Sequence, residues 1–454
     1  MDVSFSTLTK EKTISQSPSL KEKIIFGAGD VGLNAMFTLF SSYVMFFYTD
    51  VIGMNAAIIG MTIMFCKIFD GISDIIAGTL IDKHKGKGGH CIPVLAKWTI
   101  PMALTVILVF LVPNASVVIR VAYIFVTYNL FNTIMYTYVG IAHSTLPTYV
   151  TNNAVESGQM FVFKMLFAAI TQTVMAMAIL PMVNFFGGQN DQWAWVKSIM
   201  VFAAIGCVFL YMNVVFVKER VENDNPAENI FEGIKSALKN KYWILGTLVS
   251  LFTNFILTFN LSISVYYLNQ VVGNIGLMGT FVLMSNLPGI IVMLIMPSVM
   301  HKISKKRLII IGTALMLIAQ IIFIMAPNDN ISVLMITALI RGIGFSFPMG
   351  LYSALIGDSI EYGELKTGVR AQGILFSAGS LTGKIATGIL TSVFGVFLTF
   401  VGYDGLAQVQ AASAINGINW FFKLLPLAFM IGIVIIMFFW NVDKDTEKLR
   451  EAKA

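Results

Sequence analysis

Three ionisable side chains lie close together in a stretch of this chain that is otherwise apolar. Lys67, Asp70 and Asp74 are spaced by three and four residues, which puts them on one face of a helix. In lipid each charge would cost about 3 kcal/mol on insertion scales, so this face must look into a protein interior or a water-filled cavity. Two carboxylates one helical turn apart can offer oxygen ligands to Na⁺, or they can share a proton because two like charges this close repel.

The rest of the chain has the composition of a helical membrane protein. Of the 454 residues 57% are apolar and only 12% are charged, against about 25% charged in soluble domains, and the mean hydropathy is +0.79. The apolar runs are continuous rather than alternating, which excludes a membrane β-barrel. Runs of about 20 apolar residues predict twelve transmembrane helices. We place them near 24–48, 55–81, 92–112, 117–140, 161–186, 196–217, 243–267, 276–300, 308–326, 332–356, 374–398 and 420–440.

One long polar insert, 218–242, divides the chain almost in half. The predicted organisation is therefore a cytoplasmic N-terminal tail (1–23), a six-helix bundle (24–217), a cytoplasmic linker (218–242), a second six-helix bundle (243–440) and a cytoplasmic C-terminal tail (441–454). Within the insert, apolar residues recur at helical spacing, so its second part is predicted to form an amphipathic helix at the membrane surface.

Lysine and arginine predict the orientation of the chain. They cluster before the first span, after the second, sixth, eighth and tenth spans and in the C-terminal tail, whereas the alternate loops contain neither residue. The positive-inside rule therefore predicts a multi-pass protein of the cell (inner) membrane with both termini in the cytoplasm. The formal net charge of +6 is explained by these loops meeting an anionic lipid leaflet rather than a nucleic acid.

The sequence offers little that could support an enzyme. Cys66, Cys91 and Cys207 are isolated, and no spacing typical of a metal cluster or of a nucleotide-binding loop occurs. We therefore expect neither catalysis nor a cofactor. The expected partners are the lipid bilayer, a small-molecule substrate and a coupling ion, Na⁺ or H⁺.

Several motifs resemble one transporter family over almost the whole chain. The first span starts with FGAGDVGLN and ends with FFYTDVIG, the second carries KIFDGISDIIAGTLID, and GDSIEYGELKTGVRAQG links the tenth and eleventh spans. Together they resemble the glycoside–pentoside–hexuronide:cation symporters, the family of the melibiose permease within the major facilitator superfamily. The resemblance implies two six-helix bundles related by a pseudo-two-fold axis, with substrate bound between them at mid-membrane.

The family's cation site can be carried over residue by residue. Asp70 and Asp74 match the two acids of helix two that bind the coupling cation, and they would be the metal ligands if that cation is Na⁺. Lys384 matches the lysine of helix eleven near the cation and sugar sites. Lys67 matches a basic residue one turn before the acids, and either lysine could neutralise the carboxylates when no cation is bound.

The family's sugar site carries over only in part. Asn34 stands where the melibiose permease has a sugar-binding acid in helix one, and Val139 where it has the acid of helix four, so a galactoside is not expected. His143 falls beside that second position, and Lys164 where the permease has an arginine that contacts sugar. Asp30, one turn from Asn34, can substitute for the missing acid or can be a structural acid. The candidate substrate-binding residues are Asp30, Asn34, Lys67, His143 and Lys164.

Two further groups are interpreted as gates. Asp82 and Lys83 lie in an acid-then-base loop after the second span, which resembles the loop that latches the two bundles in the superfamily. A second cluster surrounds the cytoplasmic ends of spans ten and eleven, and its candidate gating residues are Asp358, Glu361 and Arg370. Arg341, inside span ten, is a further candidate gating residue.

The sequence thus predicts a secondary transporter, a cation-coupled symporter of a sugar glycoside, pentoside or hexuronide that works by alternating access. The alternative is an efflux carrier of the same superfamily for an amphipathic compound or lipid, which the many aromatic residues would also allow. The sequence leaves the sugar and the choice between Na⁺ and H⁺ open.

Overall fold

The structure, a computed structural model, describes residues 17–83, 89–151, 153–221, 239–300, 302–328, 330–367, 372–407 and 409–451, and its long elements are all helices. The first half contains α1 (Leu20–Phe46), η1 (Phe47–Val51), α2 (Ala56–Lys83), α3 (Ile92–Phe110), α4 (Val117–Tyr128), η2 (Asn129–Tyr136), α5 (Thr137–Val150), α6 (Ala154–Phe186) and α7 (Gln192–Phe216). The second half contains α9 (Lys241–Thr258), η3 (Phe259–Ile263), α10 (Ser264–Tyr266), η4 (Tyr267–Val271), η5 (Ile275–Leu277), α11 (Met278–Met300), α12 (Lys305–Met325), α13 (Ile331–Thr367), α14 (Gln372–Phe400), α15 (Ala412–Phe439) and α16 (Val442–Glu451).

Eleven helical stretches of the described residues are long and apolar enough to cross a membrane. Five of them join several elements: α1 with η1, α4 with η2 and α5, α9 with η3, α10 and η4, η5 with α11, and α15 with α16. The twelve predicted spans also count α2, a helix of 28 residues with charges in its middle. The all-helical, multi-pass membrane fold that the sequence predicts is confirmed, although the last span begins at Ala412 rather than near 420.

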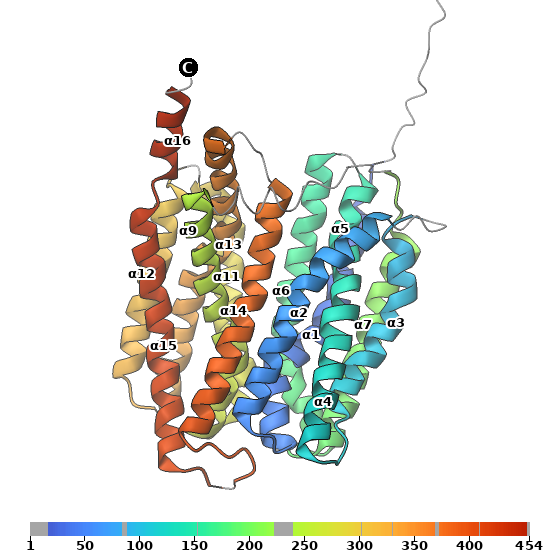
Figure 1. The fold of residues 1–454 in the computed structure, drawn as a ribbon, viewed down its shortest axis with the longest axis vertical. Coiled ribbons are helices and arrows are strands. Elements are labelled where there is room, and N and C mark those ends of the chain that lie inside the picture. Colours follow the sequence, from blue (N-terminus) through green and yellow to red (C-terminus); the bar gives the residue numbers. More distant parts are fainter. Residues whose placement is uncertain are drawn as a thin grey trace, which may run out of the picture.

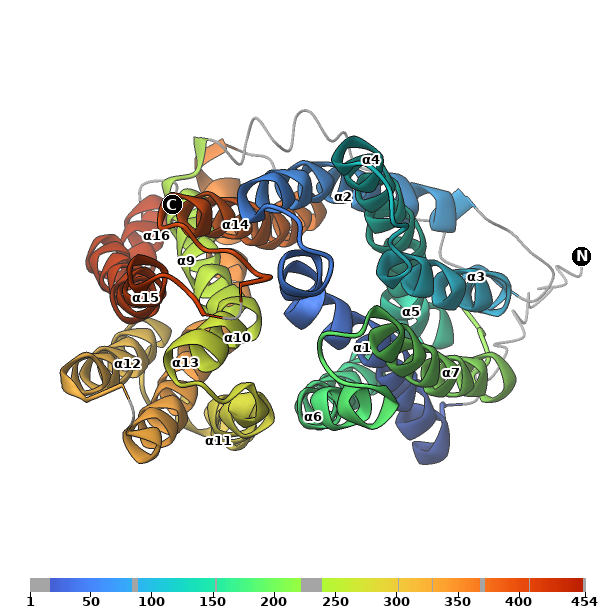
Figure 2. The same ribbon diagram turned by 90° about the horizontal axis from the view of Figure 1, so that it is seen from below.

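The helices form two groups that stand side by side, α1 to α7 in one and α9 to α16 in the other (Figures 1 and 2). We call the side on which α1 begins and α16 lies the terminal side, and the opposite side, where α1 ends and α2 begins, the far side. Between the two groups the main helix contacts are α2 with α14 and α6 with α11. These two pairs therefore fix how the halves meet.

Glycines let α2 and α14 approach closely near the far side. A Cβ atom at Gly395 would lie 2.3 Å from the carbonyl oxygen of Ala56, and one at Gly60 would lie 2.9 Å from that of Thr391. Further along the same pair, a Cβ at Gly388 would lie 2.8 Å from the Cβ of Lys67. Small residues of this kind are how membrane helices reach backbone contact, and here they bring the charged face of α2 against the other half.

The first residues of the predicted linker pack onto the first half. Glu219 accepts hydrogen bonds from three backbone N–H groups at the start of α3, those of His90, Cys91 and Ile92. Arg220 forms an ion pair with Glu22 at the start of α1, with an Nη2–Oε2 distance of 2.8 Å. The chain between 222 and 238, which includes the predicted amphipathic helix, lies outside the described residues.

Candidate functional site

Asp70 lies at the contact between the two halves and is bonded to both. Its side chain is 2% exposed. Lys67 of the same helix donates to Oδ2 at 3.3 Å, and Lys384 of α14 donates to Oδ1 at 2.8 Å. Thr137, at the start of α5, donates its hydroxyl to Oδ1 at 3.1 Å. One buried carboxylate is thus shared by two ammonium groups, one from each half of the molecule.

The structure brings together two of the three residues predicted to bind the cation, Asp70 and Lys384, and it places Lys67, a predicted substrate-binding residue, on the same carboxylate. Asp74 follows Asp70 by one turn of α2, but its side chain lies outside the described residues. The hydroxyl of Thr137 is a contact that sequence reasoning missed. Thr137 follows directly after the π-helical segment η2, and such segments are frequent at functional sites. Nothing in the residue pattern marks a π-helix in advance.

A second polar group lies inside the first half around Asp30. Asn34 donates to Asp30 Oδ2 at 2.7 Å, and His143 Nδ1 lies 3.7 Å from Asp30 Oδ1. The imidazole is fully buried and is stacked on Phe26, with ring centroids 4.6 Å apart. Lys164 of α6 donates to Ser144 at 2.6 Å. Four of the predicted substrate-binding residues therefore come from three neighbouring helices, α1, α5 and α6.

The hydrogen bonds of His143 determine which ring nitrogen carries the hydrogen. Nε2 lies 3.1 Å from the carbonyl oxygen of Phe26, and because a carbonyl can only accept, Nε2 must donate. In a neutral ring, Nδ1 then turns a lone pair toward the carboxyl group of Asp30, and it has no hydrogen-bond partner. This pair can therefore take up one further proton or a ligand hydroxyl.

On the far side, a set of polar contacts closes the space between the halves. Tyr403, between α14 and α15, donates its hydroxyl to Asp50 at the end of the first span, and Thr49 Oγ1 lies 2.8 Å from the hydroxyl of Tyr266. Gln270 donates to the Tyr403 oxygen at 3.2 Å. Burial and the nearby Asp50 raise the pKa of Tyr403, so this hydroxyl stays protonated and can donate.

These far-side residues were not predicted as functional. The motif FFYTDVIG contains Thr49 and Asp50, and an acid at the end of an apolar span is a signal that could have drawn attention to them. Their partners come from the other half of the chain, more than 200 residues away. No local pattern connects such distant positions.

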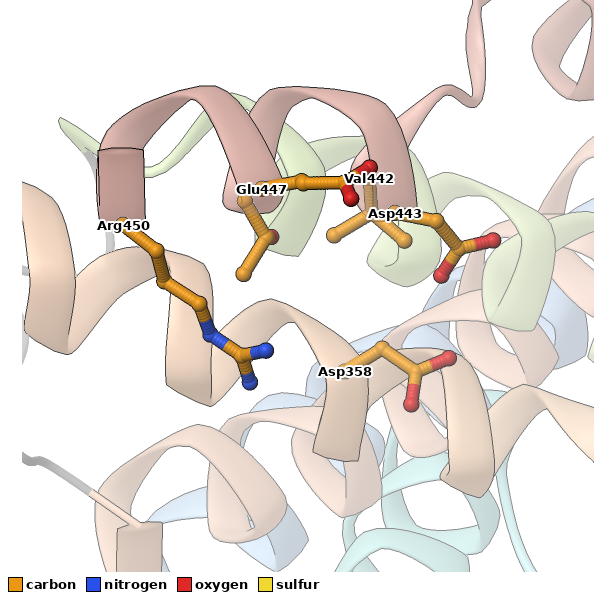
Figure 3. A pocket seen from close by; sticks show the side chains of 6 residues that line it. Asp358, Val442, Asp443, Glu447 and Arg450 are labelled. Carbon is orange, nitrogen blue, oxygen red and sulfur yellow. The ribbon is translucent and has the colours of Figure 1, made fainter. Parts of the chain in front are cut away.

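On the terminal side, the short helix α16 packs on the ends of α9 and α13. Asp445 accepts hydrogen bonds from Lys241 and from the hydroxyl of Tyr242, and Lys306 donates to the carbonyl of Trp440 at 2.7 Å. Between α13 and α16 lies a small cavity of about 280 Å³. Its lining is mostly polar and is formed by Asp358, Val442, Asp443, Thr446, Glu447 and Arg450 (Figure 3). The cavity belongs to one half only, so it does not lie on the path between the halves.

The predicted gating residues do not form one cluster among the described residues. Asp358 pairs with Lys305 at the start of α12. Arg341 lies 17 residues before Asp358 in α13, a distance of about 25 Å along a helix, and it is buried inside the second half. The side chains of the other four, Asp82, Lys83, Glu361 and Arg370, lie outside the described residues.

With this fold and site, the chain can be compared with known proteins. The model of a family described as "MFS/sugar transport protein" matches residues 25–444. The chain therefore belongs to this transporter family, which confirms the resemblance seen in its motifs. Among solved structures, a bacterial homologue of the human lysosomal transporter Spinster, in an inward-facing and unoccupied conformation, superimposes with a TM-score of 0.70 at 10% identity, covering 95% of this chain and 99% of that one. That likeness concerns the fold alone.

Two curated relatives span almost the full length. The "Isoprimeverose transporter" of Lactiplantibacillus pentosus is 28% identical over 439 residues, covering 94% of this chain and 90% of that protein. The "Uncharacterized symporter YjmB" of Bacillus subtilis is 30% identical over 433 residues, covering 93% of each. The chain is thus a multi-pass membrane transporter whose relatives include a sugar transporter and a symporter.

Proposed function

We propose that this protein is a secondary active transporter that couples the movement of Na⁺ or H⁺ to the uptake of a sugar glycoside, pentoside or hexuronide. The observation that carries the proposal is the buried carboxylate of Asp70, held by Lys67 of its own half and by Lys384 of the other half. A coupling cation that binds here must displace at least one ammonium group. Because Lys384 links the halves, displacing it changes the free energy of their arrangement, which is what coupling requires.

The proposed cation ligands are the carboxylates of Asp70 and Asp74 and the hydroxyl of Thr137. Oxygen ligands of this kind suit Na⁺, and the same carboxylates can bind a proton instead. Lys384 acts as a tethered competitor that occupies the site when no cation is bound. Lys67 lies on the same helix as Asp70 whether or not a cation is bound, so its ammonium group can neutralise the negative charge that remains.

The proposed sugar site uses the polar group of the first half, on helices of which α1 and α6 also contact the second half; its residues are Asp30, Asn34, His143 and Lys164. Asp30 and Asn34 can accept and donate hydrogen bonds to sugar hydroxyls, and Lys164 contributes a positive charge. The name of the relative from Lactiplantibacillus pentosus supports a glycoside as substrate. Lys67 donates a hydrogen bond to Asp70. We propose that cation binding at Asp70 acts through Lys67 on the affinity of this site for sugar.

We place the terminal side in the cytoplasm and the protein in the inner membrane, because the basic loops lie on that side. We propose that the far-side contacts of Asp50 and Tyr403 then close the outer entrance. The charges proposed to close the opposite entrance when the outer one opens are those of the predicted gating residues Asp82, Lys83, Asp358, Glu361 and Arg370.

The test is uptake of labelled sugars into proteoliposomes that contain the purified protein. A panel of glycosides, pentosides and uronides is offered with an inward Na⁺ gradient, with an inward H⁺ gradient, and with neither. We expect accumulation of at least one sugar with one of the two gradients, and its loss in Asp30→Asn, whereas Asp445→Asn is the control on the terminal side. Export of an amphipathic compound without any sugar uptake would instead support the efflux carrier.

A further inference from the structure

Two buried cations in the second half have no carboxylate partner among the residues that the structure describes. Arg341 of α13 is 7% exposed and Lys423 of α15 is 4% exposed. None of the ion pairs found among the described residues includes either of them. Buried charges are normally paired or neutralised, so this arrangement requires an explanation.

The contacts that these cations do make are all with neutral groups. Arg341 donates from Nη1 to Gln320 Oε1 at 2.9 Å and from Nε to the carbonyl of Thr337 at 3.3 Å. Lys423 donates to the carbonyl of Ala326 at 3.0 Å. Gln320 in turn donates to the carbonyl of Lys423 at 2.7 Å, which fixes the amide so that its oxygen faces Arg341. The site is therefore ordered but keeps its positive charge.

Two hydrogen-bond donors at the same place are unused. Arg341 Nη2 and the hydroxyl of Tyr267 are both buried and have no hydrogen-bond partner. Both residues pack against the ring of Phe323: the guanidinium of Arg341 lies 5.3 Å from its centre, and the ring of Tyr267 packs edge-on against it with centroids 5.8 Å apart. Lys423 Nζ lies 5.4 Å from the same ring centre. Unpaired buried donors are costly, and here they accompany an unpaired charge.

We propose that the second half holds a site for a small singly charged anion, bound by Arg341 and Tyr267. The anion would accept hydrogen bonds from Arg341 Nη2 and from the Tyr267 hydroxyl, while Lys423 would stabilise it at longer range. Carboxylates and halides both have this chemistry. The anion can therefore be a dissolved halide or the carboxylate of an acidic sugar, and only the second source rests on the proposed function.

The first arm of the test uses halides alone. The thermal unfolding temperature of the purified full-length protein is measured while NaCl or NaBr replaces Na₂SO₄ at constant Na⁺ concentration. We expect the unfolding temperature of the parent to rise saturably with halide concentration; this rise should be lost in Arg341→Gln and shifted to about tenfold higher halide concentration in Tyr267→Phe. The control is Arg120→Gln, which removes an arginine bonded to Ile52 and Asn114 and should behave as the parent.

The second arm compares a matched pair of sugars, p-nitrophenyl β-D-glucuronide and p-nitrophenyl β-D-glucoside, by calorimetric titration. If the anion belongs to the substrate, the glucuronide binds about tenfold more tightly or better in the parent, and the difference disappears in both variants. If neither sugar binds the parent, the proposed choice of substrate fails, and the halide arm still decides the anion site. If Arg341→Gln does not fold, Tyr267→Phe, which removes only one hydroxyl, tests the proposed anion site on its own. The proposal is overturned if the parent shows neither a halide response nor a preference for the acidic sugar, or if both persist unchanged in the folded variants.

Discussion

Lys384 donates two hydrogen bonds to Asp70, one to the carboxylate at 2.8 Å and one to the main-chain carbonyl at 3.2 Å. A single ammonium group from α14 thus holds both the charge and the backbone of α2. Since the two helices belong to different halves, this contact combines neutralisation of the cation site with attachment of one half to the other.

The first prediction concerns coupling. Asp70→Asn and Asp74→Asn should both fold in the membrane, because an amide keeps the size of the side chain and its carbonyl oxygen can still accept hydrogen bonds. Both should lose uphill accumulation of sugar. In the parent, a saturating cation should tighten sugar binding, and sugar should tighten cation binding by the same factor. That factor should fall to about one in both variants, as measured by titrating each ligand with and without the other.

The control for this prediction is Asp445→Asn, which removes an acid on the terminal side, away from the proposed cation site. If accumulation and mutual tightening both survive in Asp70→Asn and Asp74→Asn, the two acids are structural. Asp30 would then be the next candidate for the coupling site.

The second prediction concerns Lys384 as a competitor of the cation. Lys384→Met removes the ammonium group that a cation has to displace, so the cation concentration for half-maximal sugar binding should fall about tenfold, the equivalent of one charge-assisted hydrogen bond. Maximal transport should fall as well, because empty and loaded states no longer differ at the contact between the halves. A higher cation requirement in this variant would mean that the lysine builds the site instead of competing for it.

The third prediction concerns the far-side closure. Tyr403→Phe removes the hydroxyl that donates to Asp50, so the far side should open more often. In a background in which Cys66, Cys91 and Cys207 are serine, a cysteine at the buried position Ser42 should react several-fold faster with an impermeant thiol reagent. Tyr211→Phe is the matched control, because its hydroxyl donates to Ala96 within the first half. Equal rates in the two variants would argue against a gate.

The fourth prediction concerns orientation. Asn190, between α6 and α7, and Lys448, in α16, are both exposed and lie on opposite sides of the molecule. In intact cells, Asn190→Cys should react with an impermeant thiol reagent and Lys448→Cys should not, because the basic loops are proposed to face the cytoplasm. Reaction of Lys448→Cys alone would reverse the orientation.

The sequence was enough to predict the helical membrane fold and the family, because apolar runs and family motifs are local features of the chain. It also predicted Lys67 and Asp70 as neighbours, since both lie on one helix face. The pairing of Lys384 with Asp70 came from family resemblance alone, because the two residues are 314 positions apart. The closure by Tyr403 and the unpaired donors around Arg341 could not be predicted, since both depend on how helices from distant parts of the chain pack.

The glycine contact between α2 and α14 can act as a pivot about which α2 tilts relative to α14, and the ion pair of Asp70 and Lys384 lies at a distance from this pivot. Gly60 and Asp70 are ten residues apart on α2, which corresponds to about 15 Å. A tilt of about ten degrees at the glycine contact would therefore move Asp70 by about 2.6 Å, nearly the full length of its bond to Lys384. Whether the ion pair forms therefore depends on the angle between the halves. A small rotation at one end of α2 is enough to form or break it at the other end.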